Sequence, residues 1–239
     1  MSKIADFIRN VKPTTCSVVV VAAGSSVRMG EDKLYLSLRH MPVLARTLRA
    51  LDACECVDEI VLVTRADRLE KAAELCREYS VSKISHIVAG GKNRCESALA
   101  GLTEIRRSAK IVLIHDGARP LVTEDIVKEV VHQAALYKCA APAVSVTDTV
   151  KEAQEDTVLR TLDRNSLVAM QTPQAFWPDI IKAALTVAVR EGKEYTDDCA
   201  AVEAMGVKVH LSQGSRENIK ITHPLDLKTA EAILESREH

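Results

Sequence analysis

Small residues and basic residues stand together near the start of the chain. An apolar run leads directly into Ala22, Ala23 and Gly24, and Arg28 and Lys33 follow closely. Small residues at the carboxyl end of a strand allow backbone N–H groups to approach an anion, and the two cations add positive charge to the same loop. This loop therefore predicts a phosphate site suited to a nucleoside triphosphate.

The spacing of the loop excludes two common classes of nucleotide site. Gly24 and Gly30 do not follow the G-x-G-x-x-G pattern of dinucleotide-binding turns, and no G-K-[ST] sequence of a P-loop follows them. Taken alone, the loop fits equally well a tight strand-to-helix turn with incidental surface charges.

A carboxylate and a guanidinium follow a second apolar run, in the sequence H-D-G-A-R-P at 115–120. Asp116 could orient a sugar hydroxyl or hold a metal, and Arg119 could complete a substrate pocket. Alternatively, Asp116 caps a turn and Arg119 pairs with it. We assign His115 a structural role.

A Gly-Gly turn lies between an apolar run at 84–88 and a helix predicted at 97–106. The backbone of Gly91 and the hydroxyl of Ser97 could contact the polar edges of a base, although a Gly-Gly turn alone is weak support.

Threonines and basic residues continue through the second half of the chain, at Thr149, Arg164, Thr172, Thr196 and Lys220. An arginine beside small hydroxyl residues suits a phosphate contact. Each position also has an ordinary explanation, namely hydrogen bonding at a hairpin base, turn or helix-start chemistry, or, for Lys220, a solvent-facing side chain in an alternating strand before the last helix.

Short apolar runs alternate with amphipathic helical patterns. The runs lie at 18–22, 59–63, 84–88, 110–114 and 141–146, and clear helical patterns at 68–79 and 125–137. This alternation predicts an α/β fold, with a Rossmann-like, doubly wound and mainly parallel sheet covered by helices on both faces. Ligands bind beyond the carboxyl ends of such strands, where the motifs above fall.

Residues 149–164 interrupt the alternation. The polar stretch 151–156 and the alternating stretch 158–162 predict a projecting β-hairpin arm. A hairpin that cannot bury its apolar residues alone usually packs on something, so we expect a second subunit. The 239 residues are otherwise expected to form a single domain, 1–239.

The composition limits partners and compartment. A formal net charge of −1 gives no overall attraction to nucleic acid or to an anionic membrane. The apolar runs are too short for a secretory signal or a membrane span, so we expect a cytoplasmic protein. The seven cysteines show no C-x-x-C or Cys/His ligand spacing and are expected to be reduced packing thiols.

Seven motifs, in this order, resemble the family of 2-C-methyl-D-erythritol 4-phosphate cytidylyltransferases. They are A-A-G-x-x-x-R-M-G, H-D-G-A-R-P, V-T-D-T, D-R-N, Q-T-P-Q, T-D-D and N-I-K-I-T, and the likeness covers roughly 17–236. The resemblance implies a nucleotide-diphospho-sugar transferase-like fold and an enzyme that joins CTP to methylerythritol phosphate, with release of pyrophosphate, in the non-mevalonate route to isoprenoid precursors.

Two alternatives remain beside this resemblance. Ribitol 5-phosphate cytidylyltransferases share the first loop, the H-D-x-x-R-P loop and the Q-T-P-Q turn, but D-R-N-S-L at 163–167 favours the methylerythritol type. A catalytically silent nucleotide-binding protein is disfavoured because Arg28, Lys33 and Lys220 are all present.

The resemblance implies roles for the residues already singled out. The catalytic cations would be Arg28, Lys33 and Lys220; the nucleotide would be bound by Ala22, Ala23, Gly24, Gly91, Ser97 and Asp116; methylerythritol phosphate would be bound by Arg119, Thr149, Arg164, Thr172 and Thr196. Thr149 and Arg164 would come from the other subunit of a homodimer. Mg²⁺ would bridge the CTP phosphates, and no protein ligand is assigned to it.

Overall fold

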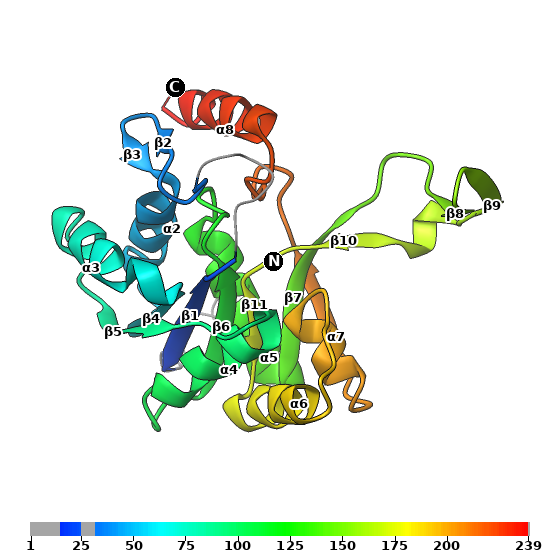
Figure 1. The fold of residues 1–239 in the computed structure, drawn as a ribbon. Coiled ribbons are helices and arrows are strands. Elements are labelled where there is room, and N and C mark those ends of the chain that lie inside the picture. The colour runs from blue at the N-terminus through cyan, green and yellow to red at the C-terminus, as the bar shows by residue number, and fades with distance from the viewer. Residues whose placement is uncertain (1–14, 25–31, 239) are drawn as a thin grey trace, which may run out of the picture.

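A mainly parallel sheet forms the centre of the molecule (Figure 1). The computed structural model describes residues 15–24 and 32–238, and within them the sheet has eight strands, in the order β10-β7-β11-β6-β1-β4-β5 with β12 paired to β7. The strands are β1 (Cys16–Ala22), β4 (Glu59–Thr64), β5 (Ile84–Ala89), β6 (Ile111–Asp116), β7 (Cys139–Ser145), β10 (Val168–Met170), β11 (Gln174–Phe176) and β12 (His210–Gln213).

The strand directions confirm the predicted sheet and add one feature to it. β1 pairs in parallel with β4 and β6, β4 with β5, and β7 with β12. β11 is antiparallel to both β6 and β7, and β10 is antiparallel to β7. β11 was not predicted, because three residues are too few to show an alternating pattern.

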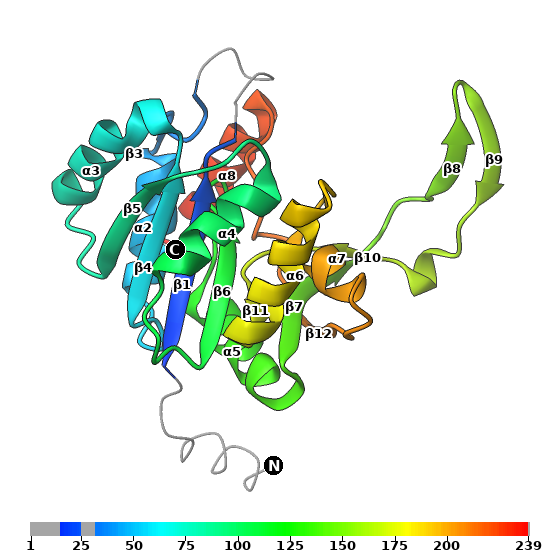
Figure 2. The ribbon, with the colours of Figure 1, turned by 60° about the horizontal axis from the view of Figure 1, so that its bottom comes forward.

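Helices cover both faces of the sheet, as predicted. One layer holds α2 (Val43–Asp52), α3 (Leu69–Glu78) and α5 (Glu124–Tyr137), and the other holds α4 (Arg94–Glu104), α6 (Pro178–Arg190) and α7 (Asp198–Glu203). Val18 and Val20 of β1 pack into the first layer and Val19 into the second, because successive side chains of a strand point to opposite faces. Figure 2 shows α4, α6 and α7 in front of the strands.

Gly101 allows α4 to lie close to the sheet. A Cβ atom at this position would lie 2.4 Å from Cγ1 of Val19 and 2.7 Å from Cγ2 of Val63, far inside van der Waals contact. The residue at this turn of α4 must therefore lack a side chain for the observed packing.

The last helix, α8 (Pro224–Ser236), packs beside the short ribbon of β2 (Ser37–Leu38) and β3 (Met41–Pro42). Leu38, Ile221 and Ala230 are buried together there. This small third core lies beside the segment that carries Lys220.

The residues around Lys220 differ from the prediction. They form no strand, although an alternating strand was expected there, so that prediction was wrong. Asn218 is fully buried, and its Nδ2 donates to the carbonyl of Thr172 at 2.9 Å. Side-chain hydrogen bonds of this kind hold the segment in place of a strand ladder.

The predicted hairpin arm is present. β8 (Lys151–Gln154) and β9 (Thr157–Thr161) pair in antiparallel fashion in a separate two-stranded sheet, with Arg164–Ser166 forming a 3₁₀ turn (η3) after them. Figures 1 and 2 both show the hairpin projecting away from the central sheet. Val158 and Leu159 are 57% and 55% exposed, which leaves apolar surface open on the arm.

None of the helices in the described part of the chain is long and apolar enough to cross a membrane. The seven cysteines form no disulfide, and all but Cys56 are buried, as expected for packing thiols.

Candidate active site

A cavity of about 450 Å³ opens at the carboxyl ends of β1 and β6. Its lining includes the loop after β1, the Gly-Gly turn with the start of α4, the end of β6, and the segment before α8. The predicted residues that line it are Ala22, Ala23, Gly24, Lys33, Gly91, Ser97, Asp116 and Lys220. Residues from four distant parts of the sequence thus meet at the sheet edge where a doubly wound fold binds ligands.

The remaining predicted residues lie elsewhere. Arg119 and Thr172 lie next to Asp116; Thr172 is buried and Arg119 is partly buried. Thr149 and Arg164 belong to the projecting arm, and Thr196 is exposed just before α7. Arg28 lies outside the described residues.

Asp116 is the electrostatic centre of the cavity. Its Oδ1 accepts from Nη1 of Arg94 at 2.6 Å, and its Oδ2 lies 2.9 Å from Nζ of Lys220 and 3.6 Å from Nε of Arg119. Burial alone would raise the pKa of Asp116, but attraction to Arg94 and Lys220 holds that pKa well below its usual range. Asp116 is therefore a carboxylate at any pH near neutrality.

Arg94 is a cavity residue that the sequence analysis missed. It is the first residue of α4, and its second nitrogen, Nη2, lies 2.6 Å from Oδ2 of Asp198, the first residue of α7. A cation at a helix N-terminus opposes the helix dipole, so its presence there requires nearby anions. That unfavourable position, together with the second aspartate of the T-D-D motif, was the signal available in the sequence.

The side chains of two residues that follow the Gly-Gly turn, Asn93 and Ser97, hold it in shape. Asn93 caps α4 by accepting from the backbone N–H of Glu96 at 2.9 Å. Ser97 Oγ accepts from the backbone N–H of Gly91 at 3.2 Å and donates to the carbonyl of Asn93 at 2.8 Å. The hydroxyl of Ser97 therefore shapes the loop as well as lining the cavity.

The chain matches one protein family over nearly its whole length. The family model described as 2-C-methyl-D-erythritol 4-phosphate cytidylyltransferase matches residues 16–236. The chain belongs to this family.

Individual relatives agree with the family match. The chain is 45% identical over 222 residues to 2-C-methyl-D-erythritol 4-phosphate cytidylyltransferase from Caldanaerobacter subterraneus subsp. tengcongensis, with 91% of this chain and 98% of the relative covered. It is 41% identical to that of Clostridium novyi over 222 residues, with 91% and 96% covered. The crystal structure of 4-diphosphocytidyl-2C-methyl-D-erythritol synthase from Anaerococcus prevotii is similar, with a TM-score of 0.82, 30% identity, and 93% and 97% of the two chains covered. These matches favour the methylerythritol type over the ribitol type.

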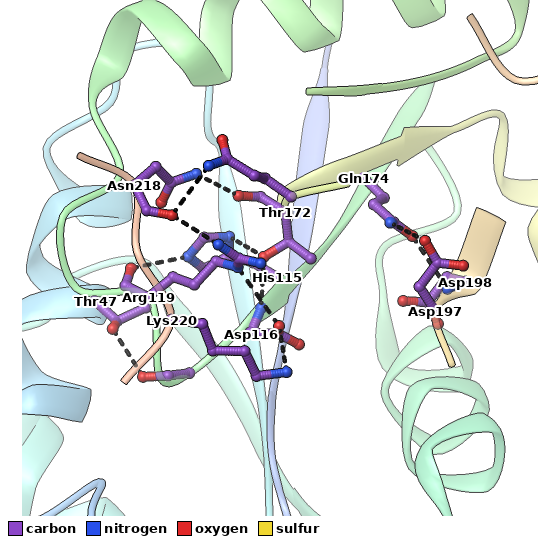
Figure 3. A network of polar contacts seen from close by, with 12 residues as sticks. Thr47, His115, Asp116, Arg119, Thr172, Gln174, Asp197, Asp198, Asn218 and Lys220 are labelled. Atoms are coloured by element: carbon purple, nitrogen blue, oxygen red, sulfur yellow. Dashed lines mark hydrogen bonds and ion pairs between the residues drawn. The ribbon is translucent and has the colours of Figure 1, made fainter. Parts of the chain in front are cut away.

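Next to Asp116 of this cytidylyltransferase-family chain lies a buried hydrogen-bonded network (Figure 3). Thr172 Oγ1 accepts from the backbone N–H of Asp116 at 3.1 Å and lies 3.0 Å from Nδ1 of His115, while Nε2 of His115 lies 3.2 Å from the carbonyl of Arg119. Because a carbonyl only accepts, Nε2 carries the proton and Nδ1 accepts from the threonine hydroxyl. Burial lowers the pKa of His115 to about 4, so the ring is neutral near pH 7.

The segment that carries Lys220 is anchored on both sides. Arg119 Nη1 donates to the carbonyl of Asn218 at 2.7 Å, and the backbone N–H of Ile221 donates to the carbonyl of Ala118 at 2.8 Å. These bonds place the Lys220 ammonium beside Asp116 although the segment has no regular structure.

The start of α7 is anchored to the sheet through Gln174 of β11. Its Nε2 donates to Oδ2 of Asp197 at 2.7 Å, and its Oε1 accepts from the backbone N–H groups of Asp198 and Cys199 at 3.1 and 3.0 Å. Asp197 in turn caps α7 by accepting from the backbone N–H of Ala200. Gln174 of the Q-T-P-Q motif thus holds the two aspartates of the T-D-D motif, which follow Thr196.

Proposed function

We propose that this chain transfers the cytidylyl group of CTP to 2-C-methyl-D-erythritol 4-phosphate, giving 4-diphosphocytidyl-2-C-methyl-D-erythritol and pyrophosphate for isoprenoid precursor synthesis. The observation that carries the proposal is the cavity itself. In a chain of this family, Asp116, Lys33 and Lys220 meet beside the small residues that follow β1. A cytoplasmic location stays a prediction of the sequence analysis.

The reaction is an in-line displacement at the α-phosphorus of CTP. A phosphate oxygen of the acceptor forms the new P–O bond, the bond between the α-phosphorus and the bridging oxygen breaks, and pyrophosphate leaves with that electron pair. The acceptor phosphate is already ionised at neutral pH, so no general base is required. Catalysis then depends on alignment and on cations near the developing charge.

Lysines supply that charge in the described part of the cavity. Lys33 and Lys220 both line it, and Lys220 lies 2.9 Å from Asp116, which fixes its ammonium group. We assign both lysines to the phosphates, and Arg28 joins them by family resemblance. An ammonium held in advance costs little reorganisation during the reaction.

The small residues would bind the nucleoside. Ala22, Ala23, Gly24 and Gly91 bring backbone groups to the cavity surface. Backbone contacts can distinguish cytosine from uracil because the exocyclic oxygen of uracil reverses a hydrogen-bond donor and acceptor. Asp116 would accept from a ribose hydroxyl, since it is ionised and faces the cavity.

Mg²⁺ fits this donor set as a companion of the nucleotide. Among the described residues that line the cavity, the one carboxylate is Asp116, whose two oxygens already contact Arg94 and Lys220. Mg²⁺ keeps several waters and needs few protein ligands, so a cavity whose one carboxylate is already engaged suits an ion held mainly by the CTP phosphates. Bound there, the ion would neutralise charge on the CTP phosphates.

We further propose that the arm packs on a second copy of the chain and contributes Thr149 and Arg164 to the neighbouring site. Supporting this, every residue of β8 and β9 is exposed in the single chain. Within this chain Arg164 Nη1 donates to the carbonyl of Thr147 at 2.8 Å, a contact that keeps the base of the arm folded.

The test is pyrophosphate release by the purified protein with CTP and Mg²⁺, comparing methylerythritol 4-phosphate with ribitol 5-phosphate and using UTP as the nucleotide control. We expect turnover with CTP and methylerythritol phosphate alone. Preference for ribitol phosphate would move the chain to the sister activity, and absence of turnover with either acceptor would support a silent nucleotide-binding protein.

A further inference from the structure

The Arg94 guanidinium joins two carboxylates that belong to different segments. Nη1 lies 2.6 Å from Oδ1 of Asp116 at the end of β6, and Nη2 lies 2.6 Å from Oδ2 of Asp198 at the start of α7. The side chain of Asp198 is 1% exposed and that of Asp116 is 9% exposed. One side chain therefore connects the starts of two helices with the end of a central strand.

Only an arginine suits this position. A planar guanidinium presents separate N–H groups in fixed directions, so it can serve two carboxylates at the same time. A lysine ammonium is a single point charge on a flexible stem and cannot reproduce this fork. Because Arg94 occupies Oδ1 of Asp116, it also leaves Oδ2 turned toward Lys220, which lies 2.9 Å away.

The two carboxylates lead to different parts of the proposed site. Asp116 lines the nucleotide cavity, whereas Asp198 follows Thr196, the residue implied for the acceptor substrate. Gln174 holds the backbone N–H of Asp198, and the Asp198 side chain then fixes this turn to Arg94. A movement of the Thr196 segment would consequently shift Arg94 and, through it, the Asp116 side chain.

The charges of these three side chains also indicate that Arg94 couples the two aspartates. Burial raises the pKa of Asp198 while Arg94 lowers it, so the ionised form of this carboxylate depends on the guanidinium. The guanidinium lies between the two anions, and its removal would take away the ion pair of Asp198, whereas Asp116 would keep its contacts with Lys220 and Arg119.

We propose that Arg94 is a positioning residue for cytidylyl transfer: it orients Asp116 toward Lys220 and the nucleotide, and couples that arrangement to the Thr196 segment on the acceptor side. This inference rests on the proposed function. Arg94 thus acts through the two aspartates to align the two substrates with each other.

The experiment compares Arg94→Lys, Asp198→Asn and the double variant with the unmodified chain. We expect Arg94→Lys to lower kcat by about tenfold or more and to raise KM for both substrates. Asp198→Asn, which keeps the size of the side chain, should raise KM for methylerythritol phosphate by about fivefold and leave KM for CTP within about twofold. The double variant should be no worse than Arg94→Lys, because both changes remove the same contact.

A matched control is Arg106→Lys. Arg106 Nε lies 3.4 Å from the nearly buried carboxylate of Glu59, at the amino end of β4 and thus at the opposite end of the sheet from the cavity. This variant should change thermal stability at most, with kcat and both KM values within about twofold of the unmodified chain. It separates the loss of an arginine–carboxylate pair elsewhere in the fold from the loss of this one.

Three results would overturn the inference. The first is a folded Arg94→Lys variant with unchanged kcat and KM values, the second is a double variant whose losses multiply, and the third is an Arg106→Lys variant with the same kinetic losses. If Arg94→Lys does not fold, the KM split of Asp198→Asn decides the question.

The proposed function can be wrong while the inference about Arg94 still holds. If the unmodified chain shows no turnover, calorimetric binding of CTP with Mg²⁺ replaces kinetics as the measurement. Binding weakened about fivefold or more by Arg94→Lys, and not by Arg106→Lys, would support the role of Arg94 in orienting Asp116. Equal binding by all variants, or no binding by the unmodified chain, would overturn it.

Discussion

The cavity at the carboxyl ends of β1 and β6 and the hairpin arm carry motifs of the same family but are built in opposite ways. At the cavity, Asp116 and Asp198 are almost fully buried and are held by Arg94 and Lys220. On the arm, the residues of β8 and β9 are all exposed, and the hairpin forms a sheet of its own. The cavity takes its shape from contacts within one chain, whereas the arm has few such contacts.

This difference indicates where each region acquires its function. The charges of the cavity are held by ion pairs within the chain, so changes there should affect chemistry directly. Thr149 and Arg164 belong to the arm and not to that network, so their proposed role requires the arm to pack on a second copy of the chain.

The largest effect is expected for Lys33→Ala. Loss of this cation from the cavity should lower kcat by about a hundredfold or more, because a group that stabilises transition-state charge is removed. Steady-state pyrophosphate release measures it. Lys110→Ala, at the amino end of β6 on the opposite side of the sheet, is the control and should be silent. Unchanged kcat in Lys33→Ala would remove this residue from the mechanism.

His115 should make the free energy of unfolding of the chain depend on pH. Because burial lowers its pKa in the folded chain to about 4, below an ordinary value of about 6.5, the unfolded chain binds the proton more tightly. The free energy of unfolding should therefore fall by roughly 3 kcal/mol as pH falls from about 7 to about 4. Urea unfolding at a series of pH values measures this dependence.

In that experiment His115→Gln is the comparison, since glutamine does not titrate. Its stability should vary less with pH over the same window. The loss due to Asp116 comes at lower pH, because the pKa of that carboxyl lies below its usual range. Parallel curves for the two proteins would show that His115 does not titrate as expected.

Arg164→Ala tests whether the arm serves a neighbouring chain. It should raise KM for methylerythritol phosphate by about tenfold and leave KM for CTP unchanged. Mixed with Lys33→Ala after joint refolding, it should regain activity, because half of the dimers then combine one intact cavity with an intact arm from the other chain. When methylerythritol phosphate is kept well below its KM, random pairing predicts roughly a quarter of the unmodified activity. No recovery would contradict an arm that acts across the dimer.

The smallest effect on the fold is expected for Val158→Ser combined with Leu159→Ser. Both side chains are exposed in the single chain, so the thermal midpoint of the separated monomer should change by only about 2 °C or less. Sedimentation velocity should nevertheless show a shift from dimer to monomer. A dimer that persists at low micromolar concentration would place the interface elsewhere.

Much of the fold could be predicted because its signals are local. The apolar runs of β1, β4, β5, β6 and β7 and the helical periods of α3 and α5 are long enough to show their type, and the polar stretch at 151–156 marked the arm. β11 has three residues and no pattern of its own, so its insertion between β6 and β7 could not be deduced.

The cavity was predicted less evenly. Residues at the strand ends, such as Gly24 and Asp116, were found because the fold brings all strand ends to one edge. Arg94 and Asp198 were missed because each resembles a solvated helix residue until the other is seen beside it. The segment around Lys220 was misjudged as a strand, since the buried bonds of Asn218 come from residues distant in sequence.

The close packing at Gly101 also predicts which residues should change together within the family. It lies two helical turns after Arg94 and allows α4 to approach Val19 and Val63 closely. A larger residue at 101 would lift the helix, and with it the guanidinium and the Gly-Gly turn, unless a smaller residue replaced one of the valines. We therefore expect positions 19, 63 and 101 to covary among homologues, although none of them lines the cavity. The shape of the cavity would then depend partly on residues outside it.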